Sequence, residues 1–112
     1  MYLIQSSQAF TASQIIDDVL VNNILATNFK RAYAVTWGAT QSALPGVVLT
    51  LKVGLNVVAD VITPNANNRI PIFPDDQLTT FGVVPGDRIL LTGRETTGVG
   101  KTLFYSFRFR PI

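Results

Sequence analysis

The chain consists of short segments rich in β-branched and aromatic residues, separated at close intervals by Gly, Pro and Asn, and this alternation most constrains its fold. The clearest segments are residues 32–38, 46–53, 57–62, 87–93 and 101–109. Val, Ile, Thr, Phe and Tyr favour strands, whereas Gly-Leu-Asn at 54–56 predicts a hairpin turn and Pro85-Gly86 a type II turn. Strands at this spacing predict an all-β chain: an antiparallel β-sandwich or jelly roll, as a single domain over residues 1–112.

Residues 11–25 (TASQIIDDVLVNNIL) fit either a helix or a strand. Their apolar positions recur at helical spacing, and Thr11 with Gln14 resembles the capping box of a helix start. The apolar residues are nevertheless Ile, Val and Leu, and two asparagines interrupt the stripe. We favour a strand because the neighbouring elements are strands, with a short helix as the alternative. Residues 1–10 open with an apolar Tyr-Leu-Ile run and are expected to form an arm or an edge strand.

The side-chain inventory argues against most catalytic and metal chemistry. The chain has no histidine and no cysteine, which removes the usual base of a catalytic triad, thiol nucleophiles, and most zinc, copper and haem ligands. A net charge of +2 is small for a nucleic-acid-binding domain, and no apolar run approaches the ~18–20 residues of a membrane-spanning helix. We therefore expect no enzyme activity, no cofactor, no metal, no specific nucleic acid and no membrane partner.

The balance of charged and apolar residues predicts a covered surface. Only 14% of the residues are charged, against about 25% in an ordinary soluble domain, while 47% are hydrophobic. Segments 46–53 and 101–109 carry apolar residues on both faces of the expected strands. Because a sandwich of this length has one interior, the second apolar face needs a neighbouring subunit. We therefore expect self-association, as a homodimer or homotrimer.

The segment GVGKT at residues 98–102 resembles the end of a phosphate-binding loop. Such a loop has Gly, four residues and then Gly-Lys-Ser/Thr, but the position of the first glycine is occupied by Glu95, whose carboxylate would repel phosphates. A helix should follow the loop, yet residues 102–110 have a strand pattern. We interpret residues 96–100 as a hairpin loop between two strands and predict no nucleotide site.

Two further groups of residues are candidates for chemistry. The acid pairs Asp17-Asp18 and Asp75-Asp76 are interpreted as solvated turn residues, because adjacent acids on a strand point to opposite faces and no alternating series of calcium ligands surrounds them. Tyr33 and Trp37 share one face of their segment, as an aromatic platform for a sugar ring or as core residues. Core packing is the interpretation we favour.

The last segment contains the candidate contact surface. Alternation puts Leu103, Tyr105, Phe107 and Phe109 on one face, which we interpret as core, and Thr102, Phe104, Ser106, Arg108 and Arg110 on the other. The second face is either an ordinary solvated face, which we favour, or a basic, partly aromatic stripe that docks on an acidic protein surface. The candidate partner-contact residues are Arg88, Phe104, Arg108, Arg110, Tyr2 and Ile4. Arg88 is expected on a strand beside the last segment.

Three pieces of the chain together resemble a known kind of protein: SSQAFTASQIIDDVLV, IPIFPDDQ and VVPGDRILLTGRETTGVGKTLFYSFRF. They are similar to the small β-sandwich or jelly-roll proteins of tailed-bacteriophage virions, in particular capsid decoration (cement) proteins. The resemblance implies a virion structural protein that is made in the host cytoplasm, sits on the capsid surface and bridges subunits of the major capsid protein. A carbohydrate- or receptor-binding sandwich of a tail or fibre adhesin is the alternative.

Overall fold

Strands make up the regular secondary structure of the chain. A computed structural model describes residues 2–20, 29–42, 45–63, 66–73 and 75–112. The strands are β1 (Tyr2–Phe10), β2 (Ile15–Ile16), β3 (Tyr33–Gln41), β4 (Val47–Val53), β5 (Asn56–Ile62), β6 (Gln77–Val83), β7 (Ile89–Glu95) and β8 (Lys101–Pro111). The described residues contain no helix, and hence none long and apolar enough to cross a membrane.

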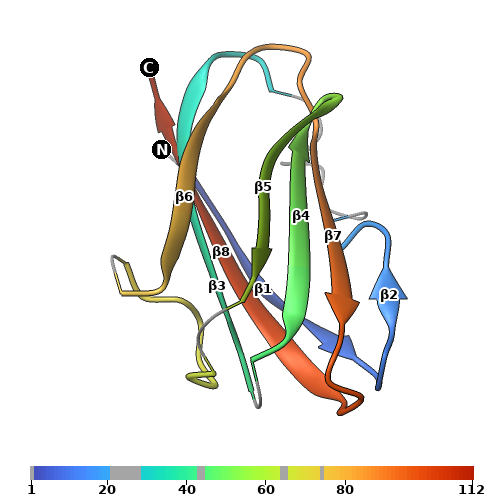
Figure 1. Cartoon of the computed structure of the whole chain (residues 1–112). Helices are drawn as coiled ribbons and strands as arrows, with labels where there is room; N and C mark the ends of the chain where they lie inside the picture. The colour runs from blue at the N-terminus through green and yellow to red at the C-terminus, as the bar shows by residue number, and fades with distance from the viewer. Residues whose placement is uncertain (1, 21–28, 43–44, 64–65, 74) are drawn as a thin grey trace.

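The strands form two four-stranded antiparallel sheets that face each other, in the orders β1-β8-β3-β6 and β2-β7-β4-β5 (Figure 1). Strand β1 pairs with β8, β2 with β7, β3 with β6 and β4 with β5. This nested pairing is that of one long antiparallel hairpin wrapped into two sheets, which is the jelly-roll arrangement. The predicted β-sandwich is confirmed, and the strand order selects the jelly roll.

The core lies between the two sheets and follows the alternation of side chains along each strand. In β4, the residues at alternate positions from Val47 to Val53 are buried and those between them are half-buried. In β8, Leu103, Tyr105, Phe107 and Phe109 are buried, as the sequence predicts. The Trp37 ring stacks on Phe107, with centroids 5.4 Å apart and an interplanar angle of 10°.

Turns end the strands where the sequence places Gly. Gly54 follows β4 with a φ of 60°, and β4 pairs with β5 as the expected hairpin. Gly86 has a φ of 91°, and the Asp87 N–H donates to the Val84 carbonyl at 3.1 Å, which closes the turn predicted at Pro85-Gly86. The hairpin predicted at residues 96–100 is wrong, because β7 and β8 belong to different sheets and the loop crosses from one to the other.

Residues 11–20 form turns and the short strand β2 in place of a helix. The Thr11 N–H donates to Gln14 Oε1 at 2.8 Å, so the expected capping contact forms without a helix after it. Ser13 has a φ of 58°, which a right-handed helix does not allow. The favoured strand is confined to Ile15–Ile16 in this part, and residues 21–25 lie outside the described residues. Residues 2–10 form an edge strand, β1.

Candidate functional site

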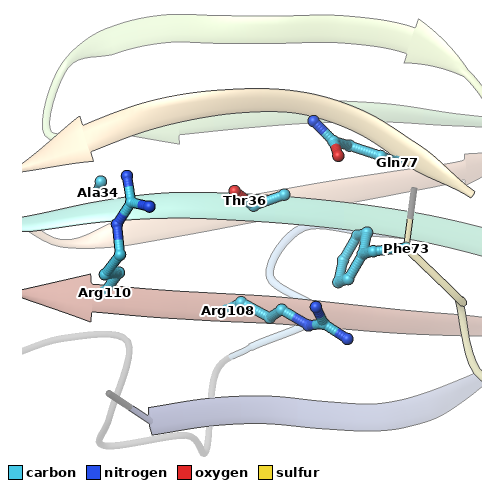
Figure 2. Close-up of a pocket in the computed structure, with 6 residues that line it drawn as sticks. All are labelled: Ala34, Thr36, Phe73, Gln77, Arg108 and Arg110. Carbon is cyan, nitrogen blue, oxygen red and sulfur yellow. The ribbon is translucent and has the colours of Figure 1, made fainter.

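A shallow pocket lies on the outer face of the β1-β8-β3-β6 sheet, with a volume of about 290 Å³ (Figure 2). It is lined by Ala34, Thr36, Phe73, Gln77, Arg108 and Arg110. The register places Thr36 opposite Arg108 and Ala34 opposite Arg110. Because residues directly opposite each other share a face, the small β3 side chains leave space beside the two arginines.

Arg108 is held against an aromatic ring. Its guanidinium carbon lies 4.5 Å from the centroid of Phe73, which precedes β6 (Figure 2). A cation over a ring face is attracted by about 0.5–1 kcal/mol at an exposed site. This contact restricts the position of the guanidinium group at the edge of the pocket.

Neither arginine of the pocket pairs with a carboxylate of the described residues. The acids that form ion pairs contact other cations: Asp18 pairs with Arg88, Asp76 with Arg69, and Glu95 with Lys101. Arg108 and Arg110 are both exposed on the strand face that points away from the core. The pocket is therefore a local concentration of positive charge.

The structure brings together part of the predicted contact surface. Arg108 and Arg110 line the pocket, whereas Phe104 lies farther along the same strand face, is half-buried, and faces Thr40 in the register. The expected position of Arg88 beside the last strand is wrong: it precedes β7 in the other sheet, and its guanidinium pairs with Asp18 at 2.8 Å.

Of the two amino-terminal candidates, the structure describes the side chain of Ile4 alone. Ile4 is wrong as a contact residue, because it is 3% exposed and belongs to the core. It pairs in register with Phe107, an inward-facing position, so the alternation of β1 turns it inward. The backbone of Tyr2 pairs with Phe109, and its side chain lies outside the described part of the structure.

Phe73, Gln77 and Thr36 complete the pocket, and the sequence did not single them out. Phe73 lies in the Ile-Pro-Ile-Phe-Pro stretch between β5 and β6, where an aromatic residue between prolines is a weak sign of a packed loop. Gln77 and Thr36 are ordinary strand residues whose position depends on the β3–β6 and β3–β8 registers. No local pattern reveals such a register.

A second surface feature is the apolar edge of β5, which comprises Leu55, Val57, Val58 and Ile62. Strand β5 ends its sheet and pairs only with β4. Leu55 is 98% exposed, Val57 56% and Ile62 62%. The β4–β5 register shifts between Leu51 and Lys52, so Val58 has no partner in it and is exposed as well. Four of the exposed large hydrophobic residues of the described chain thus lie together at this edge.

The outer face of the last strand is less apolar than predicted. Phe104 is half-buried, Ser106 is buried, and the two arginines are exposed. In β4 the outward Val48 is half-buried. The apolar edge of β5 therefore exposes more hydrophobic surface than either segment that the sequence analysis emphasised.

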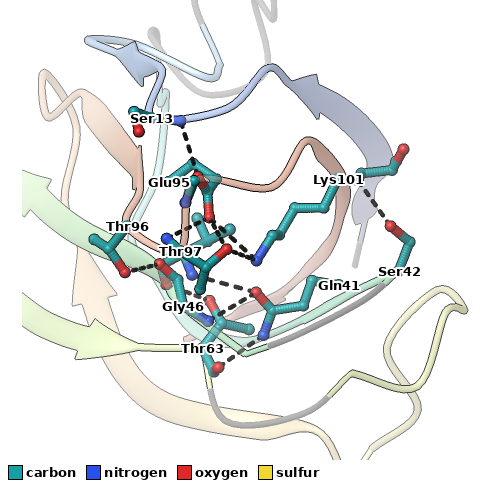
Figure 3. Close-up of polar contacts among 12 residues, drawn as sticks. Ser13, Gln41, Ser42, Gly46, Thr63, Glu95, Thr96, Thr97 and Lys101 are labelled. Atoms are coloured by element: carbon teal, nitrogen blue, oxygen red, sulfur yellow. Dashed lines mark hydrogen bonds and ion pairs between the residues drawn. The ribbon is translucent and has the colours of Figure 1, made fainter.

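Lys101 of the GVGKT segment is buried in a polar network, and its Nζ lies 3.2 Å from Oε1 of Glu95 (Figure 3). Glu95 accepts hydrogen bonds from the N–H groups of Ser13, Thr97 and Gly98 and from the Thr97 hydroxyl. Burial opposes ionisation, but the hydrogen bonds from Thr97, Ser13 and Lys101 outweigh it and hold the pKa of Glu95 far below its usual range. The lysine is occupied by a structural carboxylate, which agrees with the prediction of no nucleotide site.

The acid pairs are also structural in part. Asp76 is buried, contrary to the prediction of a solvated turn acid, and accepts hydrogen bonds from Asn67 at 2.9 Å and from the Ile72 N–H at 3.0 Å. Burial raises the pKa of Asp76, but these bonds and Arg69 lower it more, so the net shift is downward. Asp75 is exposed. In the described part of the chain, no three His, Cys, Asp or Glu residues form a group that could hold a metal ion.

The aromatic pair is core. Trp37 is fully buried, and its Nε1–H donates to Thr79 Oγ1 at 2.7 Å. Tyr33 is half-buried and packs edge-on against Phe109, with centroids 6.0 Å apart. The favoured interpretation of core packing is confirmed, and these two rings do not form an exposed platform.

Comparisons with protein-family models, with curated proteins and with solved structures find no match for this chain. The basic pocket and the apolar edge of β5 are therefore interpreted from their own geometry. Both are suited to contact with another protein.

Proposed function

We propose that the chain is a virion structural protein, a capsid decoration protein that bridges major capsid subunits and stabilises the shell by non-covalent burial. It associates with itself as a homodimer or homotrimer. In this proposal it is made in the cytoplasm of a host cell and ends on the capsid surface of a bacteriophage.

The observation that carries the proposal is the apolar edge of β5. An edge strand presents unpaired backbone groups, and proteins usually protect such strands with charged residues, proline or a cover. Here the exposed positions are Leu55, Val57, Val58 and Ile62, with Asp60 as the charged residue of the strand. Exposed apolar side chains on an open edge favour burial by a partner.

A contact of ordinary size is sufficient for this role. A standard interface buries about 800 Å² on each partner, a little over half of it apolar, which gives roughly 20 kcal/mol before the costs of association. Repetition around a shell then adds the contributions of many modest contacts.

The fold is compatible with the proposal but does not select it. Jelly rolls occur in viral capsid proteins and in lectins, and one fold serves many functions. The lectin alternative relied on Tyr33 and Trp37, which are packed against and within the core. We therefore put forward the structural role alone.

Immunoelectron microscopy tests the proposal. An antibody against the purified protein is applied to virions from the source that encodes the chain, and we expect label over the whole capsid surface. Label confined to the tail, or absent from particles, refutes a decoration role. Native mass spectrometry of the purified protein should show a dimer or trimer.

Matched variants test whether oligomer formation and capsid label depend on the apolar edge of β5. Val57→Lys and Ile62→Lys replace exposed side chains, so the fold should tolerate them, and we expect loss of the oligomer or of capsid label. Ile15→Lys, which makes the same kind of change at an exposed position of the other edge strand of this sheet, β2, is the control. Equal behaviour of all three variants contradicts a role for the β5 edge.

A further inference from the structure

We infer that the pocket of Arg108 and Arg110 binds two carboxylates of an acidic, extended segment of the partner protein. This inference rests on the proposed function, because the partner is the shell subunit on which the protein docks. The juxtaposition that carries it is a pair of unpaired arginines at alternate positions of β8, one of them fixed by Phe73.

The first argument is spacing. Residues two apart on a strand share a face and lie about 6.5–7 Å apart. An extended segment with acidic residues at positions i and i+2 presents two carboxylates on one face with the same repeat. Each guanidinium can then meet one carboxylate, and its fork of N–H donors matches the two oxygens.

The second argument is that no carboxylate side chain of the protein neutralises the two arginines. All seven carboxylate side chains of the protein belong to described residues, and none forms an ion pair with Arg108 or Arg110. Both guanidiniums are exposed, so a ligand need not displace an existing ion pair.

The third argument is orientation. The guanidinium carbon of Arg108 lies over the Phe73 ring, 4.5 Å from its centroid, and this attraction restricts the position of the guanidinium group. Thr36 and Gln77 add polar groups at the floor and rim, while Ala34 leaves room beside Arg110 (Figure 2). Less side-chain freedom is lost on binding when one arginine is already positioned.

An acidic protein segment suits this pocket better than a nucleic acid. A volume of about 290 Å³ admits side-chain heads but is at the lower limit for a whole small ligand. A nucleic-acid footprint needs a longer basic stripe, and the net charge of the protein is only +2.

The test is a titration of the ¹⁵N-labelled protein followed by NMR. The probe is the blocked peptide Thr-Glu-Thr-Glu-Thr, with Thr-Gln-Thr-Gln-Thr as the uncharged control and Thr-Thr-Glu-Glu-Thr as the spacing control. We expect shifts of the amides around Arg108 and Thr36 with the first peptide, weaker binding of the third, and none of the second. Inorganic phosphate and oligothymidylate are titrated in parallel.

Variants locate the binding. The double substitution Arg108→Gln with Arg110→Gln should weaken binding about tenfold or more, as expected for loss of charge-assisted hydrogen bonds. Arg94→Gln removes an exposed arginine of the other sheet and should leave binding unchanged. Phe73→Leu keeps the charge and should weaken binding by a smaller factor.

Three results overturn the inference: no binding of the acidic peptide, equal binding by the double variant, or tighter binding of phosphate or oligothymidylate. A decoration assay on virions distinguishes failure of the pocket proposal from failure of the proposed function. If the double variant still decorates capsids at the wild-type level, the pocket proposal fails and the decoration role stands. If the peptide binds but the protein is absent from capsids, the decoration role fails and the pocket stands.

Discussion

Phe107 and Phe104 allow a direct test of the sandwich, because they lie on the same strand and point to opposite faces. Phe107 is fully buried against Trp37, whereas Phe104 is half-buried on the outer face. A buried Phe removes about 150–250 Å² from water, or roughly 4–6 kcal/mol at 25 cal/mol per Å². The alanine variant keeps part of this burial and leaves a cavity, so we expect Phe107→Ala to cost about 3–5 kcal/mol.

The matched change Phe104→Ala should cost less, about 1–2 kcal/mol, because that side chain is only partly buried on the outer face and its removal leaves no closed cavity. Phe107→Leu retains most of the volume and loses the ring stacking, which is worth about 0.5–1.5 kcal/mol, so its cost should lie between the two.

Urea unfolding provides the measurement. Trp37 is the single tryptophan and contacts Phe107, so its fluorescence reports on this part of the core, with circular dichroism as a second probe. The urea concentration at the midpoint of unfolding should fall, while the dependence of the free energy of unfolding on urea concentration stays constant. Equal losses for Phe104→Ala and Phe107→Ala would refute the assignment of β8 faces on which the core and the pocket both depend.

Two further predictions concern close packing and charge. A Cβ at Gly38 would clash with the Asp76 carbonyl oxygen, so Gly38→Ala should lower the free energy of unfolding by about 1–3 kcal/mol, whereas at Gly82 the nearest atom is 3.8 Å away and the same change should be mild. Thermal melts compare the two, and equal melting temperatures would contradict this packing. The folded pKa of Glu95 is depressed, so its stabilising contribution is present at neutral pH and is lost as the pH falls below about 4.5 towards the folded value. Glu95→Gln should therefore be less stable than wild type at pH 7, where it leaves Lys101 without its carboxylate, and should lose less stability between pH 7 and pH 3. Urea unfolding measures the free energy of unfolding of both proteins at both pH values. If the difference between them is the same at pH 7 and pH 3, this role of Glu95 is refuted.

Local patterns predicted β3, β4, β5, β7 and β8 and the core face of β8 correctly, but they missed β6 at residues 77–83. The alternation in residues 101–110 separates Phe107 from Arg108 because side-chain direction in a strand has a period of two, whatever the rest of the chain does. The turns at Gly54 and Pro85-Gly86 follow equally from backbone preferences of single residues. The same reasoning excluded a nucleotide loop from Glu95 and from the strand pattern after Lys101.

The other errors concern contacts between distant segments. Alternation cannot say which side of β1 faces the core, so Ile4 was assigned to the surface. Residues 96–100 have the composition of a hairpin loop, yet they connect two sheets. Asp76 has the sequence context of a solvated turn, and burial by Asn67, Arg69 and the Ile72 backbone makes it structural.

The sequence by itself determined that the chain forms short antiparallel strands around one core, and that Arg108 and Arg110 lie on the face away from it. Only the tertiary structure decided that the strands nest into a jelly roll, that Phe73 lies over Arg108, and that four exposed apolar residues lie together at the apolar edge of β5. The physical reason is range: side-chain alternation and turn preferences act over a few residues, whereas strand order and register depend on pairing between segments that the chain separates widely.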